Sequence, residues 1–318
     1  MSAVMFSLQF LLLTFAVSCI LAAPAPLGGI KLPHTNLENT HALSVTIIQD
    51  KLVRPAEYTG IAYCPSALVQ NWTCGIPCGR VKGIEILEVG GDDGSVPLYY
   101  IAHDPATHTI IVAHRGTDPN HILSIANDIQ FGFEKLNSTW FPNADKRIEV
   151  HDGFQDAFRR TAGAVLSGVT AGIQSKGATQ VLVTGHSLGA AIASMDAVML
   201  RQHIDHSISM DTVVFGLPRV GNSHWADLLD TTLQPNFTHV TNQKDPVPNV
   251  PPHFMGYVHP SQEVHISAAN QQGATTTVFC PGRENNRCSD GNRLFGLSVA
   301  DHLGPYFQNI TLASSTCV

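Results

Sequence analysis

The residues best suited to chemistry in this chain surround a serine that stands between two glycines. Residues 180–184 are rich in β-branched side chains and lead into Gly-His-Ser-Leu-Gly at 185–189, which further small residues follow. A strand, a G-x-S-x-G turn and a helix in this order place the serine hydroxyl at the tip of a sharp turn. Free backbone N–H groups and the positive end of the helix dipole there favour a developing negative charge. The pattern predicts Ser187 as the nucleophile of an acyl transfer.

Ser187 needs a general base, and the base needs an orienting carboxylate, because a serine hydroxyl is a weak nucleophile at neutral pH. With this type of turn, the acid and then the histidine follow the serine along the chain. Asp245 follows a short apolar run and precedes Pro246, which stops the strand and aims the carboxylate from its carboxyl end. We therefore expect Asp245 as the acid. Other downstream carboxylates fit this geometry less well: Asp211, Asp227, Asp230, Glu263, Glu284, Asp290 and Asp301.

The base is harder to identify, because the chain has 16 histidines. His302 is the best candidate, since a histidine on a C-terminal loop can fold back onto the serine turn. Two rivals remain open: His265 alternates with apolar residues along an apparent strand, and His259 precedes a proline. The side chain of His186 is expected to point away from the substrate and to pack beneath the turn.

The negative oxygen that forms during acyl transfer needs at least two hydrogen-bond donors. The backbone N–H of Leu188, directly after the nucleophile, supplies one, and a loop after an earlier strand supplies the other. Thr117 lies in such a loop, where Gly116 lets the backbone approach closely and the threonine hydroxyl adds a donor. A plain turn threonine is the alternative interpretation of Thr117.

The order of strands and helices predicts the fold class. Strands are expected at 83–89, 96–103, 109–114, 180–184, 212–215 and 238–241, and helices at 53–64, 155–174, 188–202 and 223–233. Such alternation favours one α/β domain with a mostly parallel central sheet, whose active groups gather at the carboxyl ends of the strands. We expect a signal peptide at 1–23, an N-terminal arm at 24–52 and the domain at 53–318.

The N-terminus and the overall charge indicate a secreted protein. Residues 6–23 form a continuous apolar stretch that ends in small residues, as in a secretory signal; a membrane anchor is the alternative. No later segment is apolar enough to cross a membrane. The formal net charge is −7 and no basic block occurs, so nucleic acid is an unsuitable partner.

The cysteines and sequons agree with secretion. Cys19 lies in the signal, and the even number that remains implies disulfides, although several pairings are open. Local spacing suggests Cys74–Cys78 and Cys280–Cys288, which leaves Cys64–Cys317. A zinc site is the alternative, although the paired C-x-x-C pattern is missing. N-x-[ST] sequons, which mark glycan sites on the surface, occur at Asn71, Asn137, Asn236 and Asn309.

Several motifs occur together in one order along the chain. They are His-Arg-Gly-Thr at 114–117, Val-His-Asp-Gly-Phe at 150–154, Gly-His-Ser-Leu-Gly-Ala-Ala at 185–191, Phe-Gly-Leu-Pro-Arg-Val-Gly-Asn at 215–222, Asp-Pro-Val-Pro at 245–248 and Asp-His-Leu-Gly-Pro-Tyr-Phe at 301–307. From about residue 53 onwards the chain resembles the fungal extracellular class 3 lipases of the α/β-hydrolase fold, especially those of basidiomycete yeasts. The resemblance implies a triad of Ser187, Asp245 and His302, oxyanion donors at Thr117 and Leu188, and disulfides paired as above. It implies no metal or organic cofactor.

The resemblance also implies a lid over the site, between residues 117 and 131. Its segment 119–128 lacks the tryptophan that some relatives carry there. Apolar residues still form a stripe: Ile122, Leu123, Ile125 and Ala126, with Ile129 at helical spacing. Such a stripe could be hidden in water and exposed to lipid; permanent core is the alternative.

These features together predict a secreted, glycosylated, monomeric serine hydrolase that cleaves acylglycerol esters at a lipid–water interface through an acyl-enzyme. Some relatives in the basidiomycete-yeast branch prefer mono- and diacylglycerols. A feruloyl or related carbohydrate esterase on the same fold is the alternative enzyme. A binding protein on an inactive hydrolase scaffold is the alternative from another class, and the competent site positions argue against it.

Overall fold

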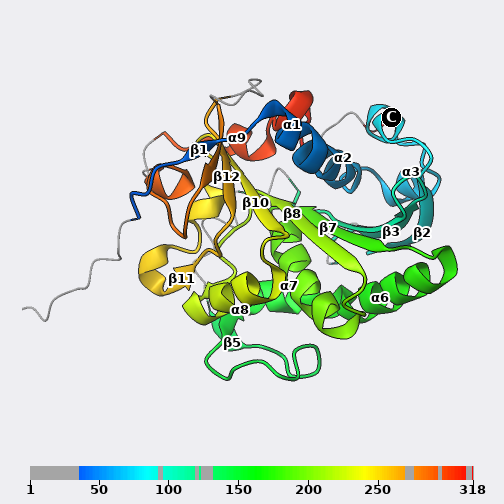
Figure 1. Cartoon of the computed structure of the whole chain (residues 1–318), viewed down its shortest axis with the longest axis horizontal. Helices are drawn as coiled ribbons and strands as arrows, with labels where there is room; N and C mark the ends of the chain where they lie inside the picture. Colours follow the sequence, from blue (N-terminus) through cyan, green and yellow to red (C-terminus); the bar gives the residue numbers. More distant parts are fainter. Residues whose placement is uncertain are drawn as a thin grey trace, which may run out of the picture. The chain divides into compact units, whose positions relative to one another are not determined.

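The large β-sheet of the protein is mostly parallel at its centre (Figure 1). A computed structural model describes residues 36–91, 96–118, 122, 132–268, 276–292, 296–312 and 317. Within these, the sheet has the order β1-β13-β12-β10-β8-β7-β4-β3-β2. The pairs β4/β7, β7/β8, β8/β10 and β10/β12 are parallel, and the strands towards both edges pair antiparallel. The expected α/β fold with a mostly parallel central sheet is confirmed.

The strands of the large sheet are β1 (His41–Ala42), β2 (Glu85–Gly90), β3 (Tyr99–Asp104), β4 (Thr109–His114), β7 (Gln180–His186), β8 (Ser209–Phe215), β10 (Phe237–Asn242), β12 (Glu263–Ile266) and β13 (Thr277–Cys280). A small second sheet contains β5 (Phe133–Lys135), β6 (Glu149–His151), β9 (Gly221–Asn222) and β11 (Tyr257–Val258). The helices are α1 (Val45–Ile48), η1 (Gln49–Val53), α2 (Arg54–Ile61), α3 (Ser66–Gln70), α4 (Ile76–Arg80), α6 (Asp152–Lys176), α7 (Leu188–His203), α8 (Ser223–Leu233) and α9 (Val299–Leu303). Short 3₁₀ turns are η3 (Val247–Asn249), η4 (His253–Met255), η5 (Ser289–Gly291) and η6 (Phe307–Asn309).

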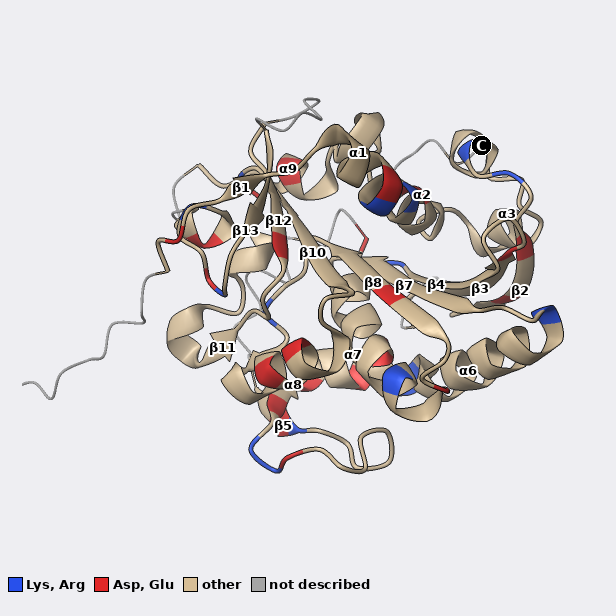
Figure 2. Ribbon diagram, in the orientation of Figure 1, with Lys and Arg blue, Asp and Glu red and all other residues tan. Residues whose placement is uncertain are grey.

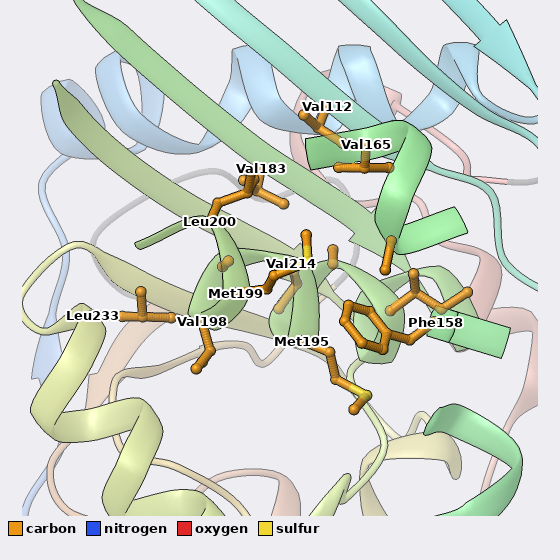
Figure 3. Packing of buried hydrophobic residues seen from close by; sticks show 14 of the residues in the cluster. Val112, Phe158, Val165, Val183, Met195, Val198, Met199, Leu200, Val214 and Leu233 are labelled. Carbon is orange, nitrogen blue, oxygen red and sulfur yellow. The ribbon is translucent and has the colours of Figure 1, made fainter. Parts of the chain in front are cut away.

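Side chains alternate between two apolar layers, one on each face of the sheet. Val181 and Val183 of β7 pack with α6, α7 and α8, whereas Leu182 packs with the layer of α1 and α2. Figure 3 shows part of the first layer, in which Val183 lies close to Leu200 of α7. Helix α7 is buried along nearly all of its length, since it lies between the sheet and the helices α6 and α8. The helix that follows the serine turn is therefore held on several sides.

Part of the expected N-terminal arm, residues 24–52, packs against the large sheet. Helix α1, the π-helical turn η1 and α2 follow one another without a break from Val45 to Ile61, and Ile48 and Leu52 are fully or almost fully buried. Strand β1 adds residues 41–42 to the sheet beside β13. The mixed local pattern of residues 41–52 gives little sign of this, because burial against the sheet, rather than local periodicity, orders them.

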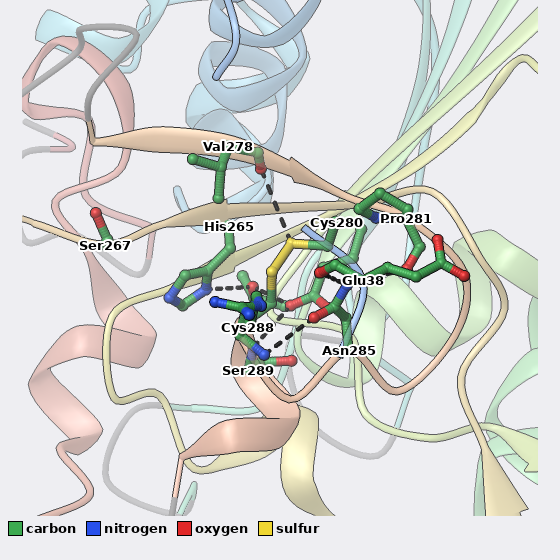
Figure 4. Close-up of a disulfide and its surroundings, with 12 residues drawn as sticks. Glu38, His265, Ser267, Val278, Cys280, Pro281, Asn285, Cys288 and Ser289 are labelled. Atoms are coloured by element: carbon green, nitrogen blue, oxygen red, sulfur yellow. Dashed lines mark hydrogen bonds between the residues drawn. A yellow bond between two sulfur atoms is a disulfide. The ribbon is translucent and has the colours of Figure 1, made fainter. Parts of the chain in front are cut away.

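Three disulfides join the cysteines that local spacing suggested: Cys64–Cys317, Cys74–Cys78 and Cys280–Cys288. The Glu263 carboxylate and the sulfurs of Cys280 and Cys288 lie within 4.8 Å of one another. Both sulfurs are bonded to each other and are not thiolates, so the zinc alternative fails at these cysteines. Figure 4 shows this disulfide between His265 and Asn285, and it fastens the end of β13 at Cys280.

The surface agrees with the sequence-based expectations in several respects. Asn71, Asn236 and Asn309 are exposed and Asn137 is half-buried. In the described part of the chain, Lys and Arg residues are spread over separate elements (Figure 2). Within the described ranges, no helix combines the length and apolar character needed to cross a bilayer.

The disulfide Cys64–Cys317 should contribute more stability than Cys74–Cys78, because it closes a far longer loop. The two bonds span 253 and 4 residues. In the chain-entropy treatment, losing the first costs about 5 kcal/mol and losing the second about 2 kcal/mol. Urea unfolding of the double variants Cys64→Ser/Cys317→Ser and Cys74→Ser/Cys78→Ser measures both. Equal losses would contradict a role for loop length.

Candidate active site

Ser187 stands at a strained turn between β7 and α7. Its backbone has φ 60° and ψ −128°, a conformation that residues other than glycine rarely adopt. The surrounding packing imposes this conformation. A Cβ at Gly185 would lie 2.2 Å from the Gly189 carbonyl oxygen, and one at Gly189 would lie 2.5 Å from the His114 carbonyl oxygen. Both glycines are therefore required by close backbone contact. The turn is tied to the next strand, since the Ser187 N–H donates to the Phe215 carbonyl at 3.0 Å.

Asp245 and His302 meet beside this turn although 57 residues separate them, and His302 lies in the short helix α9 rather than in the expected loop. His302 Nδ1 lies 2.8 Å from Asp245 Oδ2, and both side chains are buried. The other carboxylate oxygen, Oδ1, accepts the Val247 N–H at 2.8 Å. Because a carboxylate oxygen accepts, His302 Nδ1 carries the proton and Nε2 presents a lone pair. That tautomer suits a general base.

A glycine makes room for this pair. Gly216 has φ +54°, and a Cβ there would lie 2.8 Å from His302 Cε1 and 3.2 Å from Asp245 Oδ2. The residue before it, Phe215, bonds to Ser187, so the serine turn and the Asp–His pair share one strand end. The serine oxygen and His302 Nε2 are both buried without a hydrogen-bond partner among the described residues. Neither atom is engaged elsewhere, which leaves both available for proton transfer.

The loop after β4 lies directly against the serine turn. A Cβ on Gly116 would lie 2.4 Å from the His186 carbonyl oxygen and 2.8 Å from Ser187 Cβ. Thr117, next in the chain, is half-buried, and Leu188 is the first residue of α7, where backbone N–H groups have no partner within the helix. The structure thus brings the three expected groups of residues to one edge of the sheet: the serine turn, the Asp–His pair and the Gly116 loop.

Comparisons with known proteins identify the family. A model of the lipase (class 3) family matches residues 111–255. The secreted mono- and diacylglycerol lipase LIP1 of Malassezia globosa is 32% identical over 230 residues, 72% of this chain and 73% of that protein. Its counterpart LIP2 of Malassezia restricta is 28% identical over 301 residues, 94% of this chain and 92% of that protein. This chain belongs to the class 3 lipases. The Lip2 lipase structure of Yarrowia lipolytica has a TM-score of 0.77 and 25% identity, covering 89% of this lipase and 99% of that chain.

The predicted resemblance and the hydrolase fold are confirmed by these matches, and the protein is a secreted lipase. The family model and these curated relatives are named as lipases, so the feruloyl esterase alternative is not favoured. Of the expected lid residues, Ile122 is buried, while Leu123, Ile125 and Ala126 lie outside the described residues.

The rival histidines make structural hydrogen bonds in the lipase. His265 Nδ1 lies 2.8 Å from the Thr241 hydroxyl within the sheet, and burial lowers the pKa of His265. His259 stacks on His239, with ring centres 5.0 Å apart, and its Nε2 lies 2.8 Å from the Pro248 carbonyl oxygen. His186 is buried beneath the serine turn, as expected.

Most rival carboxylates are also engaged elsewhere in the lipase. Asp227 and Asp230 bind Arg283, and Asp301 accepts the Lys244 N–H. Glu263 accepts the Thr241 hydroxyl and the Ser289 N–H. Glu284 and Asp290 both bind Arg219.

Arg219 is the centre of a buried network of ion pairs and hydrogen bonds that was not predicted from the sequence. Its guanidinium makes bonds of 3.0 and 2.7 Å to the two oxygens of Glu284, one of 2.9 Å to Asp290 and one of 3.2 Å to the Pro251 carbonyl. Burial opposes ionisation of Glu284, but the attraction of Arg219 outweighs it and holds the pKa of that carboxyl below its usual range. Glu284 also accepts the His259 N–H at 2.7 Å. The network holds the loop that follows Asp245 at two points, the Pro251 carbonyl and the His259 N–H. In the sequence, the Pro-Arg-Val-Gly motif was its sign.

His259 should make this lipase less stable in mild acid. Burial lowers the pKa of His259 from 6.5 to about 4, despite the opposing charge of Glu284. Between these values the unfolded chain binds a proton at His259 that the folded protein does not, so the free energy of unfolding falls as the pH drops. The whole effect is at most about 3 kcal/mol.

The variant His259→Gln should therefore flatten the dependence of unfolding free energy on pH between about 6.5 and 4. Chemical unfolding at several pH values measures it. Exposed His206 is the control, and His206→Gln should follow the unchanged protein. A His259→Gln curve as steep as that of the unchanged protein would contradict the assignment.

Proposed function

We propose that this lipase hydrolyses mono- and diacylglycerol esters through an acyl-enzyme on Ser187. The observation that carries the mechanism is the buried 2.8 Å contact between His302 and Asp245 beside the serine turn. The substrate class is supported by the names of the Malassezia relatives, which are mono- and diacylglycerol lipases. Secretion also brings such an enzyme into contact with external lipid.

The chemistry follows the geometry of the site. His302 Nε2 takes the proton of the Ser187 hydroxyl as the oxygen attacks the ester carbonyl. Asp245 keeps the proton on Nδ1 and stabilises the imidazolium that forms. The negative oxygen of the tetrahedral intermediate is bound by the Leu188 N–H at the start of α7 and by Thr117 of the loop after β4. His302 then protonates the leaving alcohol and activates the water that releases the fatty acid.

We propose further that residues 1–23 are a secretory signal, that residues 24–52 are an N-terminal arm whose part from His41 onwards packs against the catalytic domain, and that Asn71, Asn137, Asn236 and Asn309 are glycan sites. The mature lipase acts as a monomer at the lipid–water interface without stable membrane insertion. The segment at 119–128, with Ile122, Leu123, Ile125 and Ala126, serves as its lid. The mechanism uses no metal or organic cofactor.

Replacement of the nucleophile tests the mechanism. Ser187→Ala should lower kcat by at least about 10⁴-fold without unfolding, because it removes the attacking oxygen and leaves the turn intact. Ser194→Ala is the matched control. Ser194 is a buried serine of α7, the helix that follows Ser187, and its hydroxyl donates to the Ala191 carbonyl. Hydrolysis of a soluble p-nitrophenyl ester and labelling by a fluorophosphonate measure both. Near-normal turnover by Ser187→Ala would refute the triad.

Substrate preference is tested on emulsions of mono-, di- and triacylglycerols beside methyl ferulate. We expect faster hydrolysis of mono- and diacylglycerols than of triacylglycerols, and no turnover of the ferulate. A rate increase once a lipid surface forms is expected of a lid that opens there. Preference for triacylglycerol would reject the proposed substrate class, and turnover of ferulate alone would favour the esterase.

A further inference from the structure

A chain of buried hydrogen bonds joins two segments of the site. One is the oxyanion loop, the turn after β4 that holds Thr117, and the other is the base loop, the C-terminal segment around the short helix α9 that holds His302. The Gly116 N–H donates to Tyr63 Oη at 3.1 Å. Tyr63 Oη lies 2.6 Å from His186 Nδ1, and His186 Nε2 lies 2.8 Å from the His302 carbonyl oxygen. These contacts pass directly beneath Ser187, which follows His186 in the chain. They link four segments that lie far apart in the sequence.

The direction of every bond in this chain is fixed by its ends. The last acceptor is a carbonyl, so His186 Nε2 must carry the proton and Nδ1 must accept. Nδ1 therefore accepts the phenol hydrogen of Tyr63, which leaves the Tyr63 oxygen to accept from Gly116. A neutral histidine protonated on Nε2 and a protonated tyrosine satisfy the whole chain without placing a charge in the interior.

The surroundings maintain those protonation states. Tyr63 and His186 are buried, with 8% and 0% of their surfaces exposed. Burial raises the pKa of the Tyr63 phenol and lowers the pKa of His186 well below its usual value, and the His302 ring adds to the second effect. The ring centres of His186 and His302 are 4.3 Å apart. Both shifts favour the neutral forms of Tyr63 and His186 near neutral pH, which are the forms that this chain of bonds requires.

Both ends of the chain are backbone groups beside the reacting atoms. Gly116 directly precedes Thr117, and a Cβ on Gly116 would lie 2.4 Å from Tyr63 Oη. The His302 carbonyl also accepts the Tyr306 hydroxyl at 3.0 Å, which holds the same loop from its other side. Tyr63 is itself anchored, because the next residue forms the Cys64–Cys317 disulfide.

We propose that Tyr63 and His186 are positioning residues that hold the oxyanion loop and the base loop at a fixed separation around Ser187. This inference rests on the proposed function, since it assigns Thr117 and His302 their roles in the reaction. Neither side chain needs to touch the substrate. A shift of about 1 Å between catalytic groups can lower a rate about 10²-fold. The hydrogen bonds of Tyr63 and His186, called the brace, are therefore expected to act on kcat.

The variant Tyr63→Phe tests the proposal, because it removes both bonds of the phenol and keeps the ring. With a soluble p-nitrophenyl ester we expect kcat to fall at least about tenfold and KM to change less than about twofold. Tyr100→Phe is the matched control. Tyr100 is also fully buried, and its hydroxyl donates one bond of 2.8 Å to the Tyr58 carbonyl, within the apolar layer of α2. Equal losses of kcat in the two folded variants would overturn the proposal.

A double-mutant comparison separates positioning from general stability. If Tyr63 acts through the oxyanion loop, Tyr63→Phe should lower kcat less in a Thr117→Ala background than in the unchanged lipase. Independent, multiplying effects would overturn the proposal. At the other residue, His186→Gln keeps a donor and an acceptor and should retain more of kcat than His186→Leu, which keeps neither. This pair also decides the matter if Tyr63→Phe does not fold, and equal activity of the two would count against the brace.

Ser187→Ala in the same assay keeps this test distinct from that of the function. Loss of activity in Ser187→Ala with full activity in Tyr63→Phe rejects the brace and retains the triad. Activity that survives in Ser187→Ala rejects the proposed mechanism, and the brace with it.

Discussion

The close approach of backbone to backbone around Ser187 is the constraint on which the rest of the site depends. Strands β4, β7 and β8 end at this point, and Gly116, Gly185, Gly189 and Gly216 lie where any side chain would collide with a neighbouring segment. Such contacts are possible only because the parallel strands share one edge and α7 is packed tightly behind the turn. A substitution that changes side-chain volume behind α7 is therefore expected to shift the position of Ser187 as well.

Burial determines how the polar groups at this edge behave. The Asp245–His302 pair, the Tyr63–His186 chain and the Arg219 network all lie out of water, where an unpaired polar group is costly and a paired one is held firmly. Each of them ties a different loop: the base loop, the oxyanion loop and the loop after Asp245. The reacting atoms themselves, Ser187 Oγ and His302 Nε2, are left unpaired among the described residues. Rigid surroundings with two unengaged reacting atoms are what a preorganised hydrolase site requires.

Much of the central architecture could be predicted from local patterns. The strand before Ser187, the helix after it and α8 were expected close to their observed bounds, because apolar periodicity and glycine positions specify them. The small sheet of β5, β6, β9 and β11 was not expected. Its strands have only two or three residues each, and pairing between distant segments rather than propensity forms them. The packing of residues 41–52 against the large sheet was not predicted for the same reason.

The sequence by itself determined which residues have the right chemistry and in which order they follow one another. Ser187, Asp245 and His302 could be selected because a strand–turn–helix pattern and the chain order restrict the choice. Only the tertiary structure decided which histidines and carboxylates are free to react, since His259, His265, Glu284 and Asp290 differ from the selected residues chiefly in their bonded partners. It also brought Tyr63 and His186 into one chain of bonds across 123 residues. Contacts at such separations depend on how the layers pack, and no local pattern records them.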